Sequence, residues 1–269
     1  MFIPYGRQDV TAQDIKAVTD ILNSDYLTQG PAVARFEQAI AQRVGAEFAI
    51  ASNSATSSLH IACMALGIGP GDRAWTTPVT FVASINCARY CGADIDFVDI
   101  DPRTYNISIP RLEAKLETAE ADGALPKVVI VVHLAGHPCD MAAVRALANR
   151  YGFKVIEDAS HGVGGRYRNT SIGSCHYSDI TVFSFHPVKI ITTGEGGVAL
   201  TNDAHLAERM RLFNSHGVTR DPSLLSKEPD GPWYYEQLEL GYNYRMTDIH
   251  AALGLSQLDR LDQCLDLIG

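Results

Sequence analysis

Residues 127–158 read KVVIVVHLAGHPCDMAAVRALANRYGFKVIED, and this stretch decides the fold. Its two ends, 127–132 and 154–158, have the length of buried strands, with an apolar run in the first and the apolar pair Val155 and Ile156 in the second. Between them, residues 141–151 have the length and composition of a helix. A strand, a helix and a second strand in succession are typical of a parallel sheet, because parallel strands need a crossover between them.

The same alternation continues in both directions along the chain. Short apolar runs predict further strands at 48–52, 73–77, 95–101, 179–185 and 196–202. Apolar spacing and helix-start signals predict helices at 11–23, 36–44, 54–66, from about 80, at 205–213 and at 247–267. The polar stretch 219–232 is expected to be a loop. Because the strands are apolar without alternation, we expect an α/β fold, a mostly parallel sheet with helices on both faces.

Composition and charge exclude several classes of protein. The chain has 269 residues and a formal net charge of −9, which argues against nucleic-acid binding through a broad basic surface. No apolar run approaches the roughly 20 residues of a membrane-spanning helix. The start, MFIPYGRQDV (1–10), lacks the features of a secretory signal, so we expect a cytoplasmic protein. The 6 cysteines contain no C-x-x-C pair and are expected to be reduced core residues.

Three polar segments follow predicted strands, and ligands of open α/β sheets bind beyond the carboxyl ends of the strands. The first segment is NSATS (53–57), which leads into a predicted helix. Its small residues and the helix N-terminus would suit a phosphate group. Because Ser and Asn are also ordinary helix caps, this segment alone leaves both interpretations open.

The second segment is EDASH (157–161), directly after a buried strand. The carboxylate of Asp158 needs a cationic or hydrogen-bonding partner there, because burying an unpaired charge is costly. The protonated ring nitrogen of pyridoxal phosphate (PLP) is one such partner. A cap of the following loop is the other interpretation.

The third segment is SFHPVK (184–189), which is followed by TTGEGG (192–197). A desolvated Lys189 could form a Schiff base and move protons, whereas a surface lysine is the simpler interpretation of the residue alone. The combination of phosphate cradle, Asp158 and Lys189 is more specific than any part, because PLP needs anchors for its phosphate, ring nitrogen and aldehyde.

Further motifs along the chain carry a family resemblance. They are LTQGP (27–31), NSATS, GIGPGD (67–72), TPVTFVA (77–83), FVDID (97–101), GHPCD (136–140), EDASH, SFHPVK, TTGEGG and GYNYRMTD (241–248). The sequence resembles the DegT/DnrJ/StrS-type nucleotide-sugar aminotransferases of the fold-type-I PLP class. The resemblance covers essentially the whole chain and implies the large domain of a PLP-dependent transferase.

The resemblance also implies roles for individual residues. Lys189 would bond to the cofactor and carry the catalytic proton, and Asp158 would pair with the ring nitrogen. Ala55, Thr56 and Ser184 would hold the cofactor phosphate.

Four more residues receive roles in the same way. Phe81 would stack on the cofactor ring, and His161 would lie near it. Active sites of the family form at the interface of a homodimer. Asn243 would therefore reach the phosphate of the neighbouring subunit's cofactor, with Arg245 contacting cofactor or substrate there.

The implied reaction is an amino transfer in two steps. Glutamate would give its amino group to PLP, and the cofactor would then aminate C4 of a UDP-linked 4-keto-6-deoxy-N-acetylhexosamine. This substrate follows from IPYGRQ (3–8), SFHPVK and residues 230–245, which resemble a branch of the family that serves pseudaminic acid biosynthesis. Lys189 argues against the dehydratases of the family, which have His at this position.

Family members continue into a small C-terminal domain, which we expect this sequence to lack. We expect residues 1–245 to form the PLP-binding large domain and residues 246–269 to form a linker helix leading to the missing domain. The alternative hypothesis is a truncated, non-catalytic fragment that binds PLP or dimerises.

Two other kinds of site are weaker hypotheses. The stretch HLAGHPC offers His133, His137 and Cys139 as metal ligands, but no second cluster supplies a fourth, so we predict no metal site. Gly162 and Gly164 follow a strand, yet Tyr167 stands where the third glycine of a dinucleotide-binding fingerprint belongs.

Overall fold

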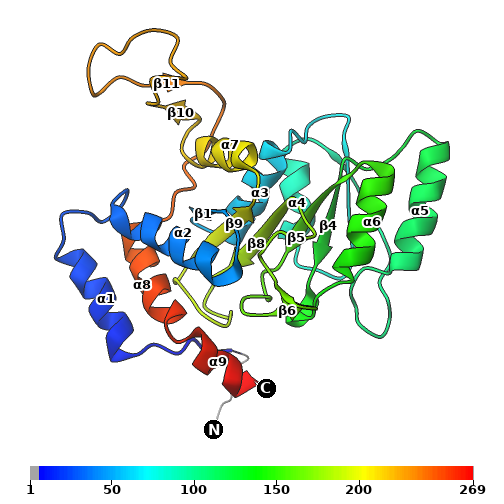
Figure 1. The fold of residues 1–269 in the computed structure, drawn as a ribbon, viewed down its shortest axis with the longest axis horizontal. Coiled ribbons are helices and arrows are strands. Elements are labelled where there is room, and N and C mark those ends of the chain that lie inside the picture. Colours follow the sequence, from blue (N-terminus) through cyan, green and yellow to red (C-terminus); the bar gives the residue numbers. More distant parts are fainter. Residues whose placement is uncertain (1–5, 269) are drawn as a thin grey trace.

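A seven-stranded sheet forms the centre of the molecule, with the strand order β1-β9-β8-β5-β4-β2-β3 (Figure 1). The structure is a computed structural model that describes residues 6–268. Residues 3–5 of the IPYGRQ motif and the last residue of the predicted linker lie outside the described residues. The strands of the sheet are β1 (Phe48–Ser52), β2 (Arg73–Thr76), β3 (Asp94–Phe97), β4 (Val128–Val132), β5 (Lys154–Asp158), β8 (Ile180–Ser184) and β9 (Gly197–Thr201).

The sheet is mostly parallel, as predicted. Strands β3, β2, β4, β5 and β8 pair in parallel along their row. Only β9 runs the other way among these seven strands, antiparallel to both β1 and β8. The start of β9 therefore lies at the edge where the other strands end, which brings the TTGEGG segment to that edge.

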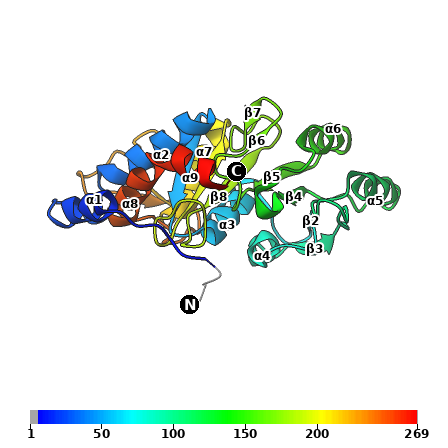
Figure 2. The same ribbon diagram turned by 90° about the horizontal axis from the view of Figure 1, so that it is seen from below.

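Helices cover both faces of the sheet (Figures 1 and 2). One face packs against α3, α4 and α7, and the other against α2 and α8 at one end and α5 and α6 at the other. The bounds are α1 (Ala12–Leu22), α2 (Pro31–Val44), α3 (Ala55–Ala65), α4 (Ala83–Tyr90), α5 (Ile109–Ala121), α6 (Met141–Tyr151), α7 (Ala204–Asn214), α8 (Asp248–Leu258) and α9 (Leu261–Ile268). None of the helices in residues 6–268 is long and apolar enough to cross a bilayer.

The side-chain alternation of β5 separates two neighbouring carboxylates. Ile156 packs with the α3 and α4 layer, and Val155 packs with the α5 and α6 layer. Because successive side chains of a strand point to opposite faces, Asp158 faces the first layer and Glu157 faces the second.

Several elements differ from the sequence-based expectation. Helix α5 was not predicted, and the helix expected at 247–267 is two helices with a break between Leu258 and Leu261. The loop expected at 219–232 lies between the two strands of a small antiparallel pair, β10 (Val218–Thr219), which includes its first residue, and β11 (Glu236–Gln237). Residues between these two strands project away from the sheet (Figure 1). A second small pair is β6 (Arg166–Tyr167) with β7 (Thr170–Ser171).

Candidate active site

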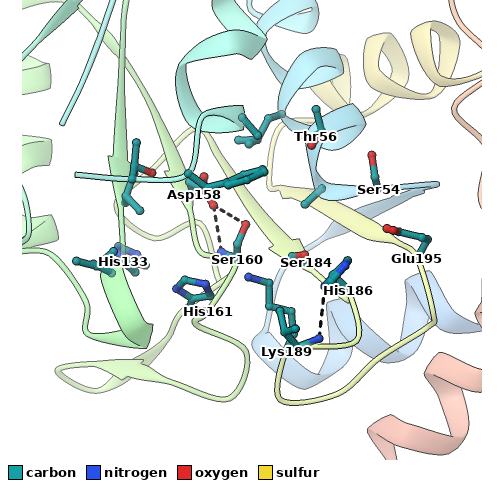
Figure 3. A pocket seen from close by; sticks show the side chains of 18 residues that line it. Ser54, Thr56, His133, Asp158, Ser160, His161, Ser184, His186, Lys189 and Glu195 are labelled. Atoms are coloured by element: carbon teal, nitrogen blue, oxygen red, sulfur yellow. Dashed lines mark hydrogen bonds between the residues drawn. The ribbon is translucent and has the colours of Figure 1, made fainter. Parts of the chain in front are cut away.

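A cavity of about 330 Å³ lies at the carboxyl ends of the parallel strands (Figure 3). It collects seven of the nine residues predicted for the site from four separate segments of the chain. These seven are Ala55, Thr56, Phe81, Asp158, His161, Ser184 and Lys189. We call this cavity the central pocket.

The start of α3 forms one wall of the central pocket. Ser54 is the N-cap, and its side chain accepts a hydrogen bond from the backbone N–H of Ser57. The backbone N–H groups of Ala55 and Thr56, the first two of the helix, have no acceptor among the described residues. Free N–H groups and the positive end of the helix dipole together make this wall suitable for an anion.

Gly197 lets β9 pass close beneath this helix start. A Cβ atom at this position would lie 2.5 Å from the Cα of Ala55 and 2.6 Å from the carbonyl carbon of Ser54. Such distances are far inside van der Waals contact, so any side chain would displace the start of α3. The glycine thus maintains the shape of the anion-binding wall.

Asp158 lies at the buried end of β5 and is held by three hydrogen bonds. Ser84 Oγ donates to Asp158 Oδ2 at 2.6 Å. Ser160 donates to Asp158 Oδ1 through its hydroxyl at 2.6 Å and through its backbone N–H at 3.2 Å. Thr80 is hydrogen-bonded to the Ser84 hydroxyl at 2.7 Å. A carboxylate with this many donors is fixed in place.

Lys189 reaches the central pocket from the loop after β8, with its side chain pointing between His161 and His186 (Figure 3). Burial lowers the pKa of Lys189 below its ordinary value, although the charge of Asp158 opposes this change. Burial, together with the nearby charge of Lys189, also lowers the pKa of His161. A lysine with a lowered pKa has more of its neutral, nucleophilic amine at neutral pH.

Ser184 and Phe81, the other two predicted residues of the central pocket, lie at different depths. Ser184 ends β8 and is buried, whereas Phe81 is 74% exposed at the mouth. Val82 and Val188 beside the mouth are exposed as well. A large exposed apolar surface at a pocket mouth is typical of a ligand or partner site.

Asn243 and Arg245, by contrast, do not line the central pocket. Asn243 is exposed and pairs through its backbone with Ser215. Arg245 donates to Ser215 Oγ at 3.1 Å and lines a different, open cavity of about 810 Å³. This second cavity contains Arg220 and His216 but no acidic residue among its described lining residues.

The structure also adds residues to the site that sequence reasoning did not select. Ser84 and Ser160 hold Asp158, and His133 forms a buried pair with Glu157. Ser160 and Glu157 lay within a motif already quoted, so their position next to Asp158 was a usable signal. Ser84 comes from α4, and only the packing of α4 on the sheet brings it to Asp158.

The model of the DegT/DnrJ/EryC1/StrS aminotransferase family matches residues 8–266. The spore coat polysaccharide biosynthesis protein SpsC of Bacillus subtilis is 41% identical over 97% of this chain and 65% of its own length. The UDP-4-amino-4,6-dideoxy-N-acetyl-beta-L-altrosamine transaminase of Campylobacter jejuni is 39% identical over 98% of this chain and 66% of its own length.

Solved structures give the same answer for the fold. PseC of Helicobacter pylori, an aminotransferase involved in the biosynthesis of pseudoaminic acid, superimposes with a TM-score of 0.87 at 33% identity. The match covers 98% of this chain and 67% of PseC. The chain spans about 65–66% of the length of the curated relatives described above. By its match to the family model over residues 8–266, the chain belongs to the DegT/DnrJ/EryC1/StrS aminotransferase family.

Proposed function

We propose that this protein is a PLP-dependent aminotransferase that aminates C4 of a UDP-linked 4-keto-6-deoxy-N-acetylhexosamine with glutamate as the amino donor. The observation that carries the proposal is the convergence of the α3 N-terminus, Asp158 and Lys189 on one pocket. Each of these groups comes from a different segment of the chain, and each suits one functional group of PLP.

The donor set of the central pocket fits PLP. The free N–H groups of Ala55 and Thr56, with Ser184, suit the phosphate. The fixed carboxylate of Asp158 suits a protonated ring nitrogen. A solved neighbour, 29–30% identical, is known in both PLP and PMP forms, which supports the same cofactor. When bound, PLP supplies the electron sink that amino-group exchange requires.

The residues of the chain have separate tasks in this proposal. Lys189, with its lowered pKa, would attach to the cofactor and move a proton at the reacting carbon. Asp158 would keep the ring nitrogen protonated, and Phe81 would cover one face of the ring. His161, whose pKa is also lowered, would lie beside the ring as a neutral imidazole.

The sugar substrate and the partner subunit rest on the relatives. The transaminase of Campylobacter jejuni and PseC of Helicobacter pylori support a sugar of the pseudaminic acid pathway. Asn243 and Arg245 would serve the site of a second copy, because both lie outside their own central pocket. All 6 cysteines are free thiols in the described structure, which suits a cytoplasmic setting. Residues 1–245 would form the cofactor-binding domain, with 246–269 leading out of it.

The first test is borohydride reduction of the protein incubated with PLP, followed by peptide mass spectrometry. We expect a pyridoxyl adduct on Lys189 and none in the Lys189→Ala variant. A folded protein that gains no adduct on Lys189 would refute the cofactor site.

A turnover assay then tests the reaction itself. The UDP-linked keto sugar and glutamate should yield the 4-amino sugar and 2-oxoglutarate, and a dTDP-linked sugar serves as the comparison for nucleotide specificity. Adduct formation without turnover of any nucleotide sugar would favour the alternative, a PLP-binding fragment without catalytic activity.

A further inference from the structure

A cluster of four aromatic side chains joins α3 and α4 to the segment 241–245, which carries Asn243 and Arg245. None of the four has a task in the proposed reaction. They come from the middle of α3, the end of α4 and the segment itself, and they are His60, Tyr90, Tyr242 and Tyr244. We call this group the aromatic cluster.

His60 lies at the centre of the aromatic cluster and is only 3% exposed. The centroid of its ring lies 5.4 Å from that of Tyr90, 5.0 Å from that of Tyr242 and 5.9 Å from that of Tyr244. The two tyrosines of the segment stack on each other, with centroids 4.8 Å apart and ring planes at 12°. These distances are in the range of favourable aromatic pairs, so the segment is packed on α3 through its side chains.

A hydrogen bond adds direction to this packing. His60 Nδ1 and the Tyr244 hydroxyl oxygen are 3.2 Å apart. Burial lowers the pKa of His60 and raises the pKa of Tyr244, so the imidazole and the phenol are both neutral near pH 7. One hydrogen therefore joins two uncharged groups. Removal of the hydroxyl would leave the ring nitrogen without this partner, which is costly at a buried position.

The backbone of the segment is paired in two isolated bridges rather than in a strand. Asn243 pairs with Ser215, and Arg245 pairs with Ser52. Bridges of this kind determine where a segment lies but specify its register weakly. A slip of one residue would turn every side chain to the opposite face. Contacts between side chains are therefore needed to decide which residues of the segment face outward.

Tyr242 and Tyr244 make this decision through their shared contact with His60. They are two residues apart and lie on the same side of the extended segment. Asn243 lies between them and therefore faces away from α3, where it is exposed. The same alternation places Arg245 on the outer side, where it donates to Ser215 Oγ at 3.1 Å.

We propose that His60 and Tyr244 are positioning residues that hold the segment 241–245 so that Asn243 points outward to a second copy of the chain. They act on the segment of their own subunit, whereas the cofactor that Asn243 would contact belongs to the other subunit. This inference rests on the proposed function, because the contact of Asn243 with that cofactor is part of it. A defect in the aromatic cluster should therefore appear in the pocket of the partner.

Tyr244→Phe is the direct test, because it removes one hydroxyl and keeps the ring. The backbone N–H of Tyr242 donates to the carbonyl oxygen of Phe213 at 2.8 Å, and that of Tyr244 donates to the carbonyl oxygen of Asn214 at 3.1 Å. In the cofactor-free variant we expect these two amides to exchange with solvent about threefold to tenfold faster, as measured by NMR.

His60→Phe repeats the test from the other side of the hydrogen bond. It also keeps a ring and should accelerate the exchange of the same two amides by a similar factor. Because both substitutions remove one and the same bond, the double variant should exchange no faster than either single variant. This comparison carries the test if Tyr244→Phe does not fold.

Tyr151→Phe is the matched control. Tyr151 is buried on α6, and its hydroxyl has no hydrogen-bond partner among residues 6–268. Removal of this hydroxyl should leave the exchange of the Tyr242 and Tyr244 amides unchanged. The control separates the loss of a particular hydrogen bond from the loss of a tyrosine hydroxyl in general.

Mixed dimers then show in which pocket the defect appears. Lys189→Ala in one chain leaves a single pocket that can form the pyridoxyl adduct, in the other chain. When Tyr244→Phe is placed in the Lys189→Ala chain, the labelled pocket faces the altered segment. The PLP concentration for half-maximal labelling should then rise about threefold to tenfold, with unchanged labelling at saturating PLP.

The reverse arrangement places Tyr244→Phe in the chain that keeps Lys189. The labelled pocket then faces an unaltered segment, and half-maximal labelling should need the same PLP concentration as without Tyr244→Phe. Two affinity tags, one on each chain, allow the mixed dimers to be purified in both arrangements.

Two results would overturn the positioning role. One is unchanged amide exchange in folded Tyr244→Phe and His60→Phe. The other is a loss of PLP affinity that is equal in both arrangements or confined to the reverse one, because the aromatic cluster would then act only within its own subunit. A wild-type protein without an adduct on Lys189, or chains that form no mixed dimer, would instead refute the proposed function. The exchange measurement on the cofactor-free protein would still decide whether His60 and Tyr244 hold the segment.

Discussion

At the scale of single residues, Ser84 is the donor that connects α4 to Asp158. Ser84→Ala leaves one carboxylate oxygen without its donor, and a hydrogen bond to a charged group contributes about 1.5–3 kcal/mol. We expect PLP to bind at least about tenfold more weakly, measured by titration of the visible absorption. Thr80→Ala removes the hydrogen bond between Thr80 and Ser84, which does not contact Asp158 directly, and should weaken PLP binding less. An equal or larger loss of PLP affinity would contradict an effect that passes from Thr80 through Ser84 to Asp158.

The reactivity of Lys189 should follow its pKa. Burial places this pKa below the ordinary 10.5, so the neutral amine becomes abundant at lower pH than in an exposed lysine. We expect acetylation of Lys189 in the cofactor-free protein to rise with pH through a midpoint below 10.5. Because Asp158 opposes the effect of burial, Asp158→Asn should move the midpoint further down. Peptide mass spectrometry measures the acetylation of Lys189 in the wild-type protein and in Asp158→Asn. Exposed Lys16 in the same samples is the internal reference for the reactivity of an ordinary lysine.

At the scale of elements, the contact between β9 and α3 determines the phosphate-binding wall. Gly197→Ala should push the start of α3 away and destabilise the protein by about 1–3 kcal/mol, as overpacked sites do. PLP affinity should fall with it. Gly69→Ala is the control, because no atom lies within 4 Å of the added Cβ. Chemical denaturation compares the stability of the two variants, and PLP titration compares their affinity for PLP. Equal stability and equal affinity would show that the contact between β9 and α3 does not determine the phosphate-binding wall.

Helix α1 is attached to α8 through one buried carboxylate. Asp14 accepts hydrogen bonds from Ser256 Oγ at 2.6 Å, Gln257 Nε2 at 2.8 Å and Arg260 Nη2 at 2.8 Å. Burial raises the pKa of Asp14, but donors that include Ser256 and Thr11 outweigh it and leave the pKa below the ordinary 3.8. Asp14 therefore stabilises the folded state above pH 3.8, and this stability is lost as the pH falls through the lower folded pKa. In Asp14→Asn the free energy of unfolding should therefore fall less steeply at acidic pH than in the wild-type protein, which unfolding curves measured at a series of pH values would show.

The elements that sequence predicted best are those whose signal is local. Strand β4 is apolar and fully buried, and β5 has an apolar centre, Val155 and Ile156, and is buried except at Lys154. The predicted bounds of both strands agree with the structure to within a residue. Helix α5 escaped prediction because its buried stripe, including Leu112 and Leu116, is interrupted by charged residues, which occupy five of its 13 positions. The pair β10–β11 could not be predicted either, because its strands are only two residues long and pair across a long loop.

The same reasoning applies to the site. Asp158 ends one strand and Lys189 follows another, so the order of segments was enough to predict that they lie at one edge of the sheet. The pairing of His133 with Glu157 depends on the register of β4 against β5 and on side-chain alternation, which no single segment contains. Asp158 and Lys189 could therefore be predicted from local sequence patterns, whereas the contact between His133 and Glu157 is determined by long-range packing.

At the scale of the whole molecule, the mouth of the central pocket is bordered by exposed apolar residues, including Phe81, Val82 and Val188. Asn243 is exposed and lies outside this pocket. Both observations suit a second copy of the chain that covers the mouth and contributes its own Asn243. If two subunits share each site, a mixed dimer of two differently defective variants should contain one intact site, which is not expected if each subunit forms its site alone.

Two defective variants should complement each other. Lys189→Ala cannot form the pyridoxyl adduct, and Asn243→Ala should bind PLP weakly because its partner's phosphate contact is lost. In a mixed dimer, one pocket combines Lys189 from the second variant with Asn243 from the first and is intact. Coexpression with two tags, tandem purification and borohydride reduction should therefore restore the adduct at PLP concentrations where neither variant alone is labelled. If Asn243 instead serves its own subunit, each mixed dimer keeps one defect in each pocket, and labelling stays at the level of the Asn243→Ala protein alone.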